Sequence, residues 1–309
     1  MRQFTHRHLV GTVAAGLALV AAGCGGSAKT STGVGGASKG TMTIGAFNFS
    51  ESAILADMYE GALKKEGFTV TVRPNLGSRE VVEPALERGD IQMYPGYAAT
   101  ELEFVNKAAG EASPDANATV AKLRARLEPK GITALDPSPA LDANAFAVTK
   151  ATAAKYNLTK LSDLAPVASQ LVLGGPPECP TRPFCQAGLV KTYGLNFKDF
   201  KPLDAGGPLS KAALDDGTVQ VALIFSSDGA IAAKGYVVLD DDKHLQNADN
   251  VVPVIKTASA TAEARTVLNK VSAALTTADL AQLNKRADVD KEDPETLAAD
   301  WLKQHGFTS

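Results

Sequence analysis

The sequence is poor in the residue types from which most catalytic and metal sites are built. Its 309 residues include only four histidines, three cysteines and one tryptophan. No histidine stands beside a serine or cysteine in a nucleophile motif, and no HExxH zinc motif, P-loop or GxGxxG motif occurs. A hydrolytic triad therefore lacks a base, and no metal or cofactor is expected. A carboxylate-only enzyme stays open, because Asp and Glu pairs are plentiful.

Positive charge is not in excess either. The net charge is −3 and the pI is about 5.9, and no basic stripe interleaved with aromatic residues occurs. A nucleic-acid partner is therefore not expected. The acidic run 240–242 lacks further acidic residues at calcium-ligand spacing and is interpreted as a solvated turn. What the chain does have is 45% hydrophobic residues, enough for a substantial core in two lobes.

The first forty residues indicate export. Two arginines precede the apolar run 9–22, which is too short for a membrane span and leads into Ala21-Ala22-Gly23-Cys24. That ending resembles a bacterial lipobox, so we predict a signal peptide over residues 1–23 and a lipid anchor on Cys24. A plain cleaved signal with an incidental cysteine is the alternative. Residues 24–40 are rich in Gly, Ser, Thr and Ala and are predicted to be a flexible tether at the extracytoplasmic face of the cell membrane.

The other two cysteines are Cys179 and Cys185. Five residues separate them, which excludes the geometry of a CxxC redox motif, and no nearby His/Cys pair completes a zinc site. Because an exported protein meets an oxidising environment, a short-range disulfide is the natural interpretation.

One short pattern occurs twice. Residues 85–93 (ALERGDIQM) and 213–221 (ALDDGTVQV) each suggest a helix end, a glycine stop and a strand. The repeat predicts two similar α/β lobes. Ligands of open α/β sheets bind at the carboxyl ends of strands, so facing strand ends are expected to form a cleft for a small molecule. A common helix ending met twice by chance is the alternative.

Hydrophobic periodicity predicts the elements of both lobes. A helix capped by Ser50 lies between strands 41–45 and 68–72, which makes a βαβ unit and a largely parallel sheet. Further strands are predicted at 91–94, 132–136, 144–148, 171–175 and 236–239, and further helices at 78–88, 101–109, 116–130, 262–275, 278–286 and 294–305. The chain is expected to recross between the lobes around residues 251–255. We expect the first lobe to comprise residues 41–143 and 253–309, and the second lobe residues 144–252.

Four segments together resemble the substrate-binding proteins of osmoprotectant ABC importers, the glycine betaine/carnitine/choline (OpuAC-type) family. They are residues 44–51, 75–81, 89–97 and 206–229. The resemblance implies an α/β, two-lobed class II periplasmic-binding fold with two hinge crossings, and a separately encoded permease and ATPase as partners. Ligands of the family are quaternary ammonium compounds held among aromatic rings, because such a group donates no N–H hydrogen bond and is bound by cation–π attraction.

The resemblance also implies site residues. Tyr97-Ala98-Ala99-Thr100 stands where the family has Tyr-Thr-Gly-Thr, which suggests a cage ring at Tyr97 and a carboxylate-binding hydroxyl at Thr100. Arg182 is expected to pair with a ligand carboxylate. Phe225 is expected to supply a ring, with a core ring as its alternative.

At other positions the chain departs from the family pattern. Asn144 stands where members often carry a tyrosine and could instead be a turn residue, and Asp249 or Asn250 aligns with a late tyrosine. Phe47 aligns with a polar residue and cannot bind a carboxylate. The predicted ligand site, which is more polar than usual for the family, comprises Tyr97, Thr100, Asn144, Arg182, Phe225, Asp249 and Asn250.

These features predict a solute-binding component of an ABC importer that is not an enzyme. It is expected to bind a small osmoprotectant-like solute of the glycine betaine or choline type between its lobes and deliver it to the permease. Two alternatives stay open: a receptor of the same fold for a polyhydroxylated or aromatic solute, and an exported enzyme on a binding-protein scaffold.

Overall fold

The structure is a computed structural model that describes residues 38–308. The predicted signal peptide, Cys24 and most of the predicted tether lie outside the described residues. Within this part of the chain, every helix is too short or too polar to cross a lipid bilayer.

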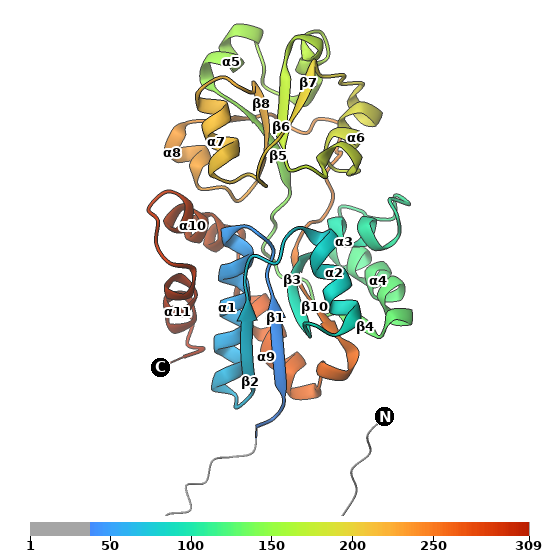
Figure 1. Cartoon of the computed structure of the whole chain (residues 1–309), viewed down its shortest axis with the longest axis vertical. Coiled ribbons are helices and arrows are strands. Elements are labelled where there is room, and N and C mark those ends of the chain that lie inside the picture. The colour runs from blue at the N-terminus through green and yellow to red at the C-terminus, as the bar shows by residue number, and fades with distance from the viewer. Residues whose placement is uncertain (1–37, 309) are drawn as a thin grey trace, which may run out of the picture. The chain divides into compact units, whose positions relative to one another are not determined.

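Residues 38–308 contain two five-stranded sheets, which form two lobes (Figure 1). The strand order is β2-β1-β3-β10-β4 in the first sheet and β7-β6-β8-β5-β9 in the second. The sheets correspond strand for strand, since three strands run parallel in each, and β10 and β5 are antiparallel to β3 and β8. The chain crosses to the second lobe between β4 and β5 and returns between β9 and β10, so the two predicted crossings are confirmed.

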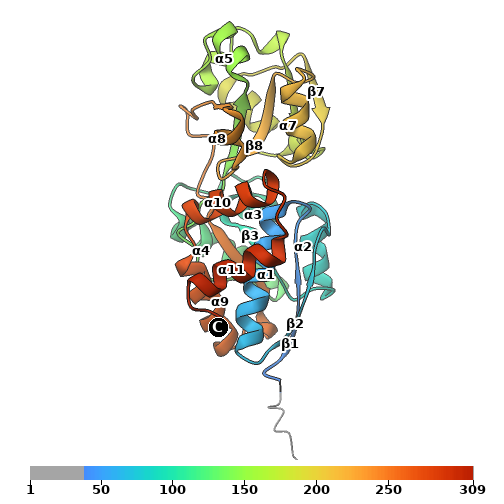
Figure 2. The ribbon, with the colours of Figure 1, turned by 90° about the vertical axis from the view of Figure 1, so that its left-hand side faces the viewer.

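The first lobe takes its elements from both ends of the described chain. Its strands are β1 (Thr41–Gly45), β2 (Thr69–Arg73), β3 (Met93–Tyr97), β4 (Ile132–Ala134) and β10 (Val251–Lys256). Its helices are α1 (Ser50–Lys65), α2 (Arg79–Arg88), α3 (Ala98–Val105), α4 (Ala116–Leu127), α9 (Ala262–Ala274), α10 (Thr277–Asp288) and α11 (Pro294–Gln304). Helix α1 packs against α9, α10 and α11 (Figure 2).

The second lobe is made of one continuous segment. Its strands are β5 (Asn144–Val148), β6 (Val172–Gly175), β7 (Asp199–Pro202), β8 (Val221–Phe225) and β9 (Val237–Val238). Its helices are α5 (Lys150–Tyr156), α6 (Gln186–Gly188), α7 (Pro208–Asp215) and α8 (Ala230–Lys234). Short 3-10 turns and one π-helical turn at Leu189–Tyr193 complete it.

Most predicted elements are present, with shifted ends. Strand 144–148 coincides with β5, and β10 begins at Val251, before the boundary predicted at residue 253. The predicted cap at Ser50 is wrong, because Phe49 precedes the first turn of α1 and the Ser50 hydroxyl donates to Asp288 at 2.7 Å. The strand predicted at 91–94 is β3, which begins at Met93 and continues through Pro95 and Gly96 to Tyr97.

The repeated pattern proves to be the same structure in both lobes. Gln92 Oε1 accepts from the backbone N–H of Thr43 at 2.9 Å, and its Nε2 donates to Gly89 O at 2.9 Å. In the second lobe, Gln220 Oε1 accepts from Val172 N–H at 3.0 Å, and its Nε2 donates to Gly217 O at 2.7 Å. Each glutamine thus ties the turn after a helix to the first parallel strand of its sheet, which confirms the prediction of two similar lobes.

The hydrophobic cores of the two lobes differ in size. One hydrophobic core fills the first lobe and includes α1, all five strands and Trp301 on α11. The second lobe has two smaller clusters, one of which contains Cys179 and Cys185. The larger apolar core of the first lobe should contribute correspondingly more hydrophobic stabilisation.

Helix α10 of the first lobe also packs against the second lobe. Lys211 on α7 forms ion pairs with Asp228 at 3.0 Å and with Asp288 on α10 at 3.1 Å. At Gly229, a Cβ atom would lie 2.4 Å from the Cα of Lys285. The two backbones therefore approach as closely as glycine allows.

Candidate functional site

A cleft of about 390 Å³ lies between the two lobes. It is lined by the segments that follow β1, β3, β6 and β8, which are parallel strands whose carboxyl ends meet here. The volume suits a small organic molecule. This is the position that the repeated strand ends predicted.

Aromatic rings from both lobes line the cleft. Phe49 of the first lobe contacts Phe225 of the second, with ring centroids 5.3 Å apart, and it lies 6.1 Å from Tyr97 and 5.8 Å from Phe47. Phe104 and Phe184 add rings to the lining. Tyr97 and Phe225 are among the predicted site residues, whereas Phe49 was not predicted. The pattern Phe47-Asn48-Phe49, directly after a strand, was the signal that could have revealed it.

The hydroxyl of Tyr97 is held by the first lobe. It donates to Glu51 Oε1 at 2.7 Å, and the tyrosine is only 6% exposed. Burial and the neighbouring charge of Glu51 raise the pKa of Tyr97 well above its usual value. Since the hydroxyl is already bonded, the ring is the part of Tyr97 that remains for a ligand.

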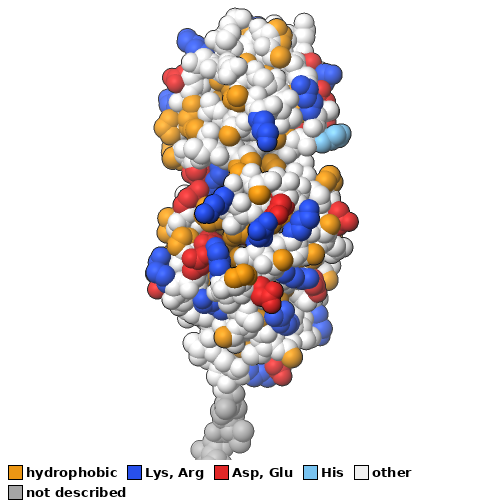
Figure 3. Space-filling view, turned by 90° about the vertical axis from the view of Figure 1, so that its right-hand side faces the viewer, with side chains coloured by type: hydrophobic (Ala, Val, Ile, Leu, Met, Phe, Trp, Pro, Cys, Tyr) orange, Lys and Arg blue, Asp and Glu red, His pale blue; other side chains and the backbone are white. Residues whose placement is uncertain are grey.

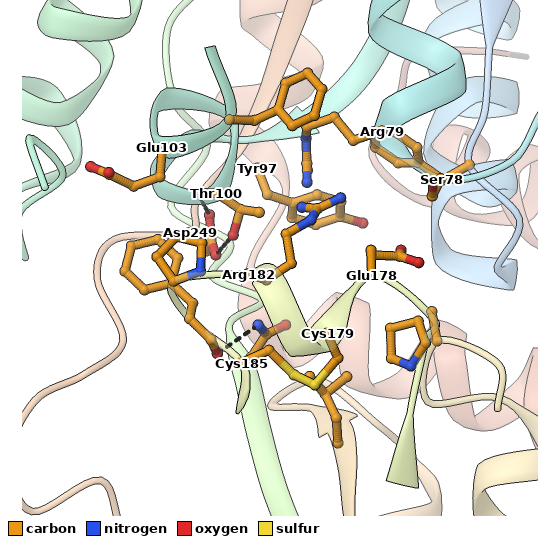
Figure 4. A pocket seen from close by; sticks show the side chains of 18 of the residues that line it. Ser78, Arg79, Tyr97, Thr100, Glu103, Glu178, Cys179, Arg182, Cys185 and Asp249 are labelled. Atoms are coloured by element: carbon orange, nitrogen blue, oxygen red, sulfur yellow. Dashed lines mark hydrogen bonds between the residues drawn. A yellow bond between two sulfur atoms is a disulfide. The ribbon is translucent and has the colours of Figure 1, made fainter. Parts of the chain in front are cut away.

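Thr100 and Asp249 are bonded to each other. Asp249 accepts from the Thr100 backbone N–H at 2.7 Å and, through its second oxygen, from the Thr100 hydroxyl, as Figure 4 shows. Burial raises the pKa of Asp249. The expected carboxylate-binding hydroxyl of Thr100 is therefore occupied by a protein carboxylate. Asn250 donates to Ser138 O at 2.9 Å and is not among the residues that line the cleft.

Two guanidinium groups reach the cleft from opposite lobes (Figure 4). Arg79 on α2 is buried and bonds Glu101 at 2.7 Å, with Phe47 under its guanidinium. Arg182 on the second lobe bonds both carboxylate oxygens of Glu80 on the first lobe, at 2.8 and 2.9 Å. Burial and the nearby charge of Arg79 lower the pKa of Arg182. The Arg182–Glu80 pair thus bridges the two lobes at the cleft.

The predicted disulfide shapes the wall that carries Arg182. Cys179 and Cys185 are bonded, and Arg182 and Phe184 lie in the loop that they close. Asn144 on β5 donates to the backbone oxygen of Phe184 at 3.0 Å, and Gln246 Nε2 donates to the same oxygen at 3.0 Å. Asn144 therefore lines the cleft and also supports the cysteine loop.

Acidic side chains outnumber basic ones in the lining. The acidic residues are Glu80, Glu103, Asp142, Glu178 and Asp249, and the basic ones are Arg79, Lys107 and Arg182. Glu103 accepts from the backbone N–H groups of Gly110 and Ala112 at 2.7 Å and points away from the other labelled side chains in Figure 4. On the face drawn in Figure 3, hydrophobic side chains are visible at the waist between the lobes, with charged ones beside them. A cleft lined by aromatic rings favours a cation.

Six of the seven predicted site residues line one cleft, and Asn250 does not. In particular, Tyr97, Arg182 and Phe225 share it. Their contact with a ligand stays a prediction. Glu51 and Asp142 were not predicted. Glu51 accepts the hydrogen bond from Tyr97, Asp142 lies at the first crossing, and the Ser227 hydroxyl contacts both carboxyl groups.

Comparisons with known proteins agree with this architecture. A family model described as the substrate binding domain of an ABC-type glycine betaine transport system matches residues 40–304. The glycine-betaine-binding protein of Pseudomonas aeruginosa is 28% identical over 86% of this chain and 88% of its own length. The carnitine transport binding protein of Listeria monocytogenes is 29% identical over 86% and 87%. A crystal structure of a glycine betaine/carnitine/choline ABC transporter superposes with a TM-score of 0.68 at 30% identity, covering 86% of this chain and 99% of the other.

Proposed function

Because the chain belongs to the family of substrate-binding domains of ABC-type glycine betaine transport systems, we propose that it binds a small solute with a quaternary ammonium group between its lobes. The fold is the type II periplasmic-binding fold, and the family is one of solute-binding proteins of transporters rather than of enzymes. The bound solute would be handed to an ABC permease and its ATPase.

The observation that carries the proposal is the lining of the cleft. Phe49 and Tyr97 of the first lobe and Phe225 of the second converge there. A quaternary ammonium offers no N–H donor, so ring faces and nearby carboxylates are the groups that attract it. Contacts to both lobes would favour the closed arrangement, because a ligand stabilises whichever state it binds more tightly.

Titration calorimetry with glycine betaine, choline and carnitine tests the proposal. The matched control is 3,3-dimethyl-1-butanol, which has the shape of choline but no charge. We expect it to bind about 5- to 30-fold more weakly than choline, since a desolvated cation–π contact contributes roughly 1 to 2 kcal/mol. Equal affinity for the charged and neutral compounds would contradict a cation site.

A receptor for a polyhydroxylated solute is the second candidate, and the polar residues Asn144 and Asp249 in the lining favour it. Tyr97→Ala separates the two. A cation site should lose about 1 kcal/mol of affinity or more through the missing ring. A hydroxyl-binding site should instead respond to Asn144→Ala and bind a polyol such as sorbitol in the same calorimeter. Turnover of a bound solute, followed by chromatography, would support the enzyme alternative.

The lipid anchor belongs to the same proposal. Fractionation of cells that produce the wild type and a Cys24→Ala variant tests it, with the wild type expected in the membrane fraction and the variant released. A membrane-bound Cys24→Ala variant would contradict anchoring at this residue.

A further inference from the structure

Two buried carboxyl groups meet one hydroxyl at the junction of the lobes. Ser227 Oγ, after β8, lies 2.8 Å from Glu51 Oε2 on α1 and 2.7 Å from Asp142 Oδ1 at the first crossing. Asn284 Nδ2 on α10 donates to the same Oγ at 2.9 Å. Glu51 is 5% exposed, Asp142 4% and Ser227 1%. Four separate segments of the chain therefore converge on this hydroxyl.

The hydrogen bonds around Ser227 require one proton more than two ionised carboxylates would provide. A hydroxyl has one hydrogen to donate and two lone pairs that accept. Asn284 uses one lone pair, and Ser227 can donate its hydrogen to only one of the two carboxyl groups. The other O···O contact is a hydrogen bond only if that carboxyl carries a hydrogen of its own. All three contacts are satisfied when one carboxyl is protonated and the other is ionised.

The surrounding contacts assign the proton to Asp142. Glu51 already accepts from Tyr97 at 2.7 Å and from Asn284 at 2.5 Å, which favours its ionised form. Asp142 Oδ1 accepts from the Ser227 N–H at 3.1 Å, and within residues 38–308 no hydrogen bond reaches its Oδ2. Burial and the charge of Glu51 raise the pKa of Asp142 well above its usual value.

The nearby basic side chains are already paired with other carboxylates, so they do not neutralise Glu51 and Asp142 in place of this proton. Arg79 is paired with Glu101, and Lys211 with Asp228 and Asp288. Lys285 on α10 pairs with Asp290 at the surface. The titratable and charged groups on the surrounding elements are Arg79 on α2, Tyr97 on β3, Lys211 on α7, Asp228 after β8, Asp249 before β10, and Lys285 and Asp288 on α10.

Asp142 also lines the solute cleft. We propose that Glu51 and Asp142 hold a single proton between them across the Ser227 hydroxyl, and that a cationic solute in the cleft releases it from Asp142. An adjacent positive charge favours the ionised form of a carboxyl, so binding of the cation and loss of the proton are linked. This inference rests on the proposed function, and it makes affinity for a cation increase as the pH rises.

Calorimetry with choline chloride measures the proton directly. Choline has no group that titrates near neutral pH, so any proton that is released comes from the protein and reacts with the buffer. Titrations at one pH, in buffers of different ionisation enthalpy, give the number of protons released per choline. We expect up to one proton in the wild type and almost none in Asp142→Asn or Glu51→Gln. Asp57→Asn is the control, since burial raises the pKa of Asp57 on α1 to about 7 while this residue lies outside both the cleft lining and the shared pair, so this variant should still release the proton.

The outcomes separate the two proposals. Choline binding with no buffer dependence would overturn the shared proton and leave the proposed function intact. Proton release that disappears in Asp57→Asn but persists in Asp142→Asn would assign the proton elsewhere and also overturn the inference. If neither choline, glycine betaine nor carnitine binds, the proposed function fails.

The unliganded protein provides a readout that needs no solute. The folded state keeps the proton at pH values where Asp142 of the unfolded chain is ionised, so this group stabilises the protein most in acid. The contribution declines as the pH rises from the usual pKa of an aspartate through the raised folded pKa. Unfolding temperatures measured across this range should therefore fall more steeply in the wild type than in Asp142→Asn. Equal slopes would contradict the shared proton, and Glu51→Gln repeats the test should Asp142→Asn not fold.

Discussion

The two lobes share one sheet topology but build their cleft walls differently. In the first lobe, the chain between β1 and β2 forms α1, a 16-residue helix buried in a large core, and its entry segment places Phe47 and Phe49 in the cleft. In the second lobe, the chain between β6 and β7 forms only short helical turns, and a disulfide closes the loop that carries Arg182. Two lobes with the same sheet topology can therefore hold their cleft walls in place either by core packing or by a disulfide.

The largest effect is expected where the first lobe buries a charge. Glu101→Gln would leave the guanidinium of Arg79 without its ionic partner, and breaking a buried pair costs about 3 to 5 kcal/mol. Chemical denaturation should show this loss. The double variant Arg79→Met/Glu101→Gln should recover part of it, because no lone buried charge remains. A loss below about 1 kcal/mol in Glu101→Gln would mean that water reaches Arg79.

A smaller loss is expected from the covalent link of the second lobe. Cys179→Ser/Cys185→Ser opens a loop of few residues, so we expect about 2 kcal/mol of lost stability in denaturant unfolding. Solute affinity should fall as well, since Arg182 and Phe184 lose their fixed loop. Reduction of the wild type should give the same change. An unchanged affinity would show that the hydrogen bonds from Asn144 and Gln246 hold the wall on their own.

Because the Gln92 and Gln220 hydrogen bonds are the same in the two lobes, their loss should destabilise the protein by similar amounts. Gln92→Ala and Gln220→Ala each leave a backbone N–H of the neighbouring strand without its acceptor, which costs about 1 kcal/mol. Unfolding midpoints of the two variants should shift by similar amounts. Markedly unequal shifts would show that the two copies of the pattern are alike in shape but not in energetic role.

The smallest effect on stability is expected at the pair that bridges the lobes. Glu80 is 44% exposed in its pair with Arg182, so Glu80→Gln should change the unfolding free energy by no more than about 1 kcal/mol. The change is instead expected in the open–closed equilibrium, which small-angle X-ray scattering of the unliganded protein measures. A more extended Glu80→Gln variant supports the bridge, and identical scattering curves would argue against it.

The two-lobed arrangement could be predicted from the sequence because it depends on local patterns. The repeat around Gly89 and Gly217 indicated two lobes, and the apolar run at 144–148 coincides with β5. The extension of β3 could not be predicted, because Pro95 normally ends a strand. In the structure Pro95 lies opposite Pro253 on β10. Two residues without N–H groups face each other, and this pairing across a long stretch of chain is invisible in either segment alone.

The site was predictable in position but not in detail. The strand ends indicated where the cleft lies, and Tyr97 and Phe225 line it, while their contact with a ligand stays a prediction. The partners of Thr100 and Arg182 could not be foreseen, because Asp249 and Glu80 are distant in sequence. Hydrogen-bond partners of this kind are set by tertiary packing. A hydroxyl that looks available in a motif can already be bonded once the chain has folded.

The close approach of Gly229 to Lys285 has a mechanical consequence. On the α10 side the lobes are in close contact at Gly229 and Lys285 and are joined by the Lys211–Asp288 ion pair, so we expect this edge to separate less readily. At the opposite edge the lobes are joined by the partly solvated Arg182–Glu80 ion pair, which is easier to separate. The lobes should therefore separate first at the Arg182–Glu80 edge, and a solute should reach the aromatic rings from that side.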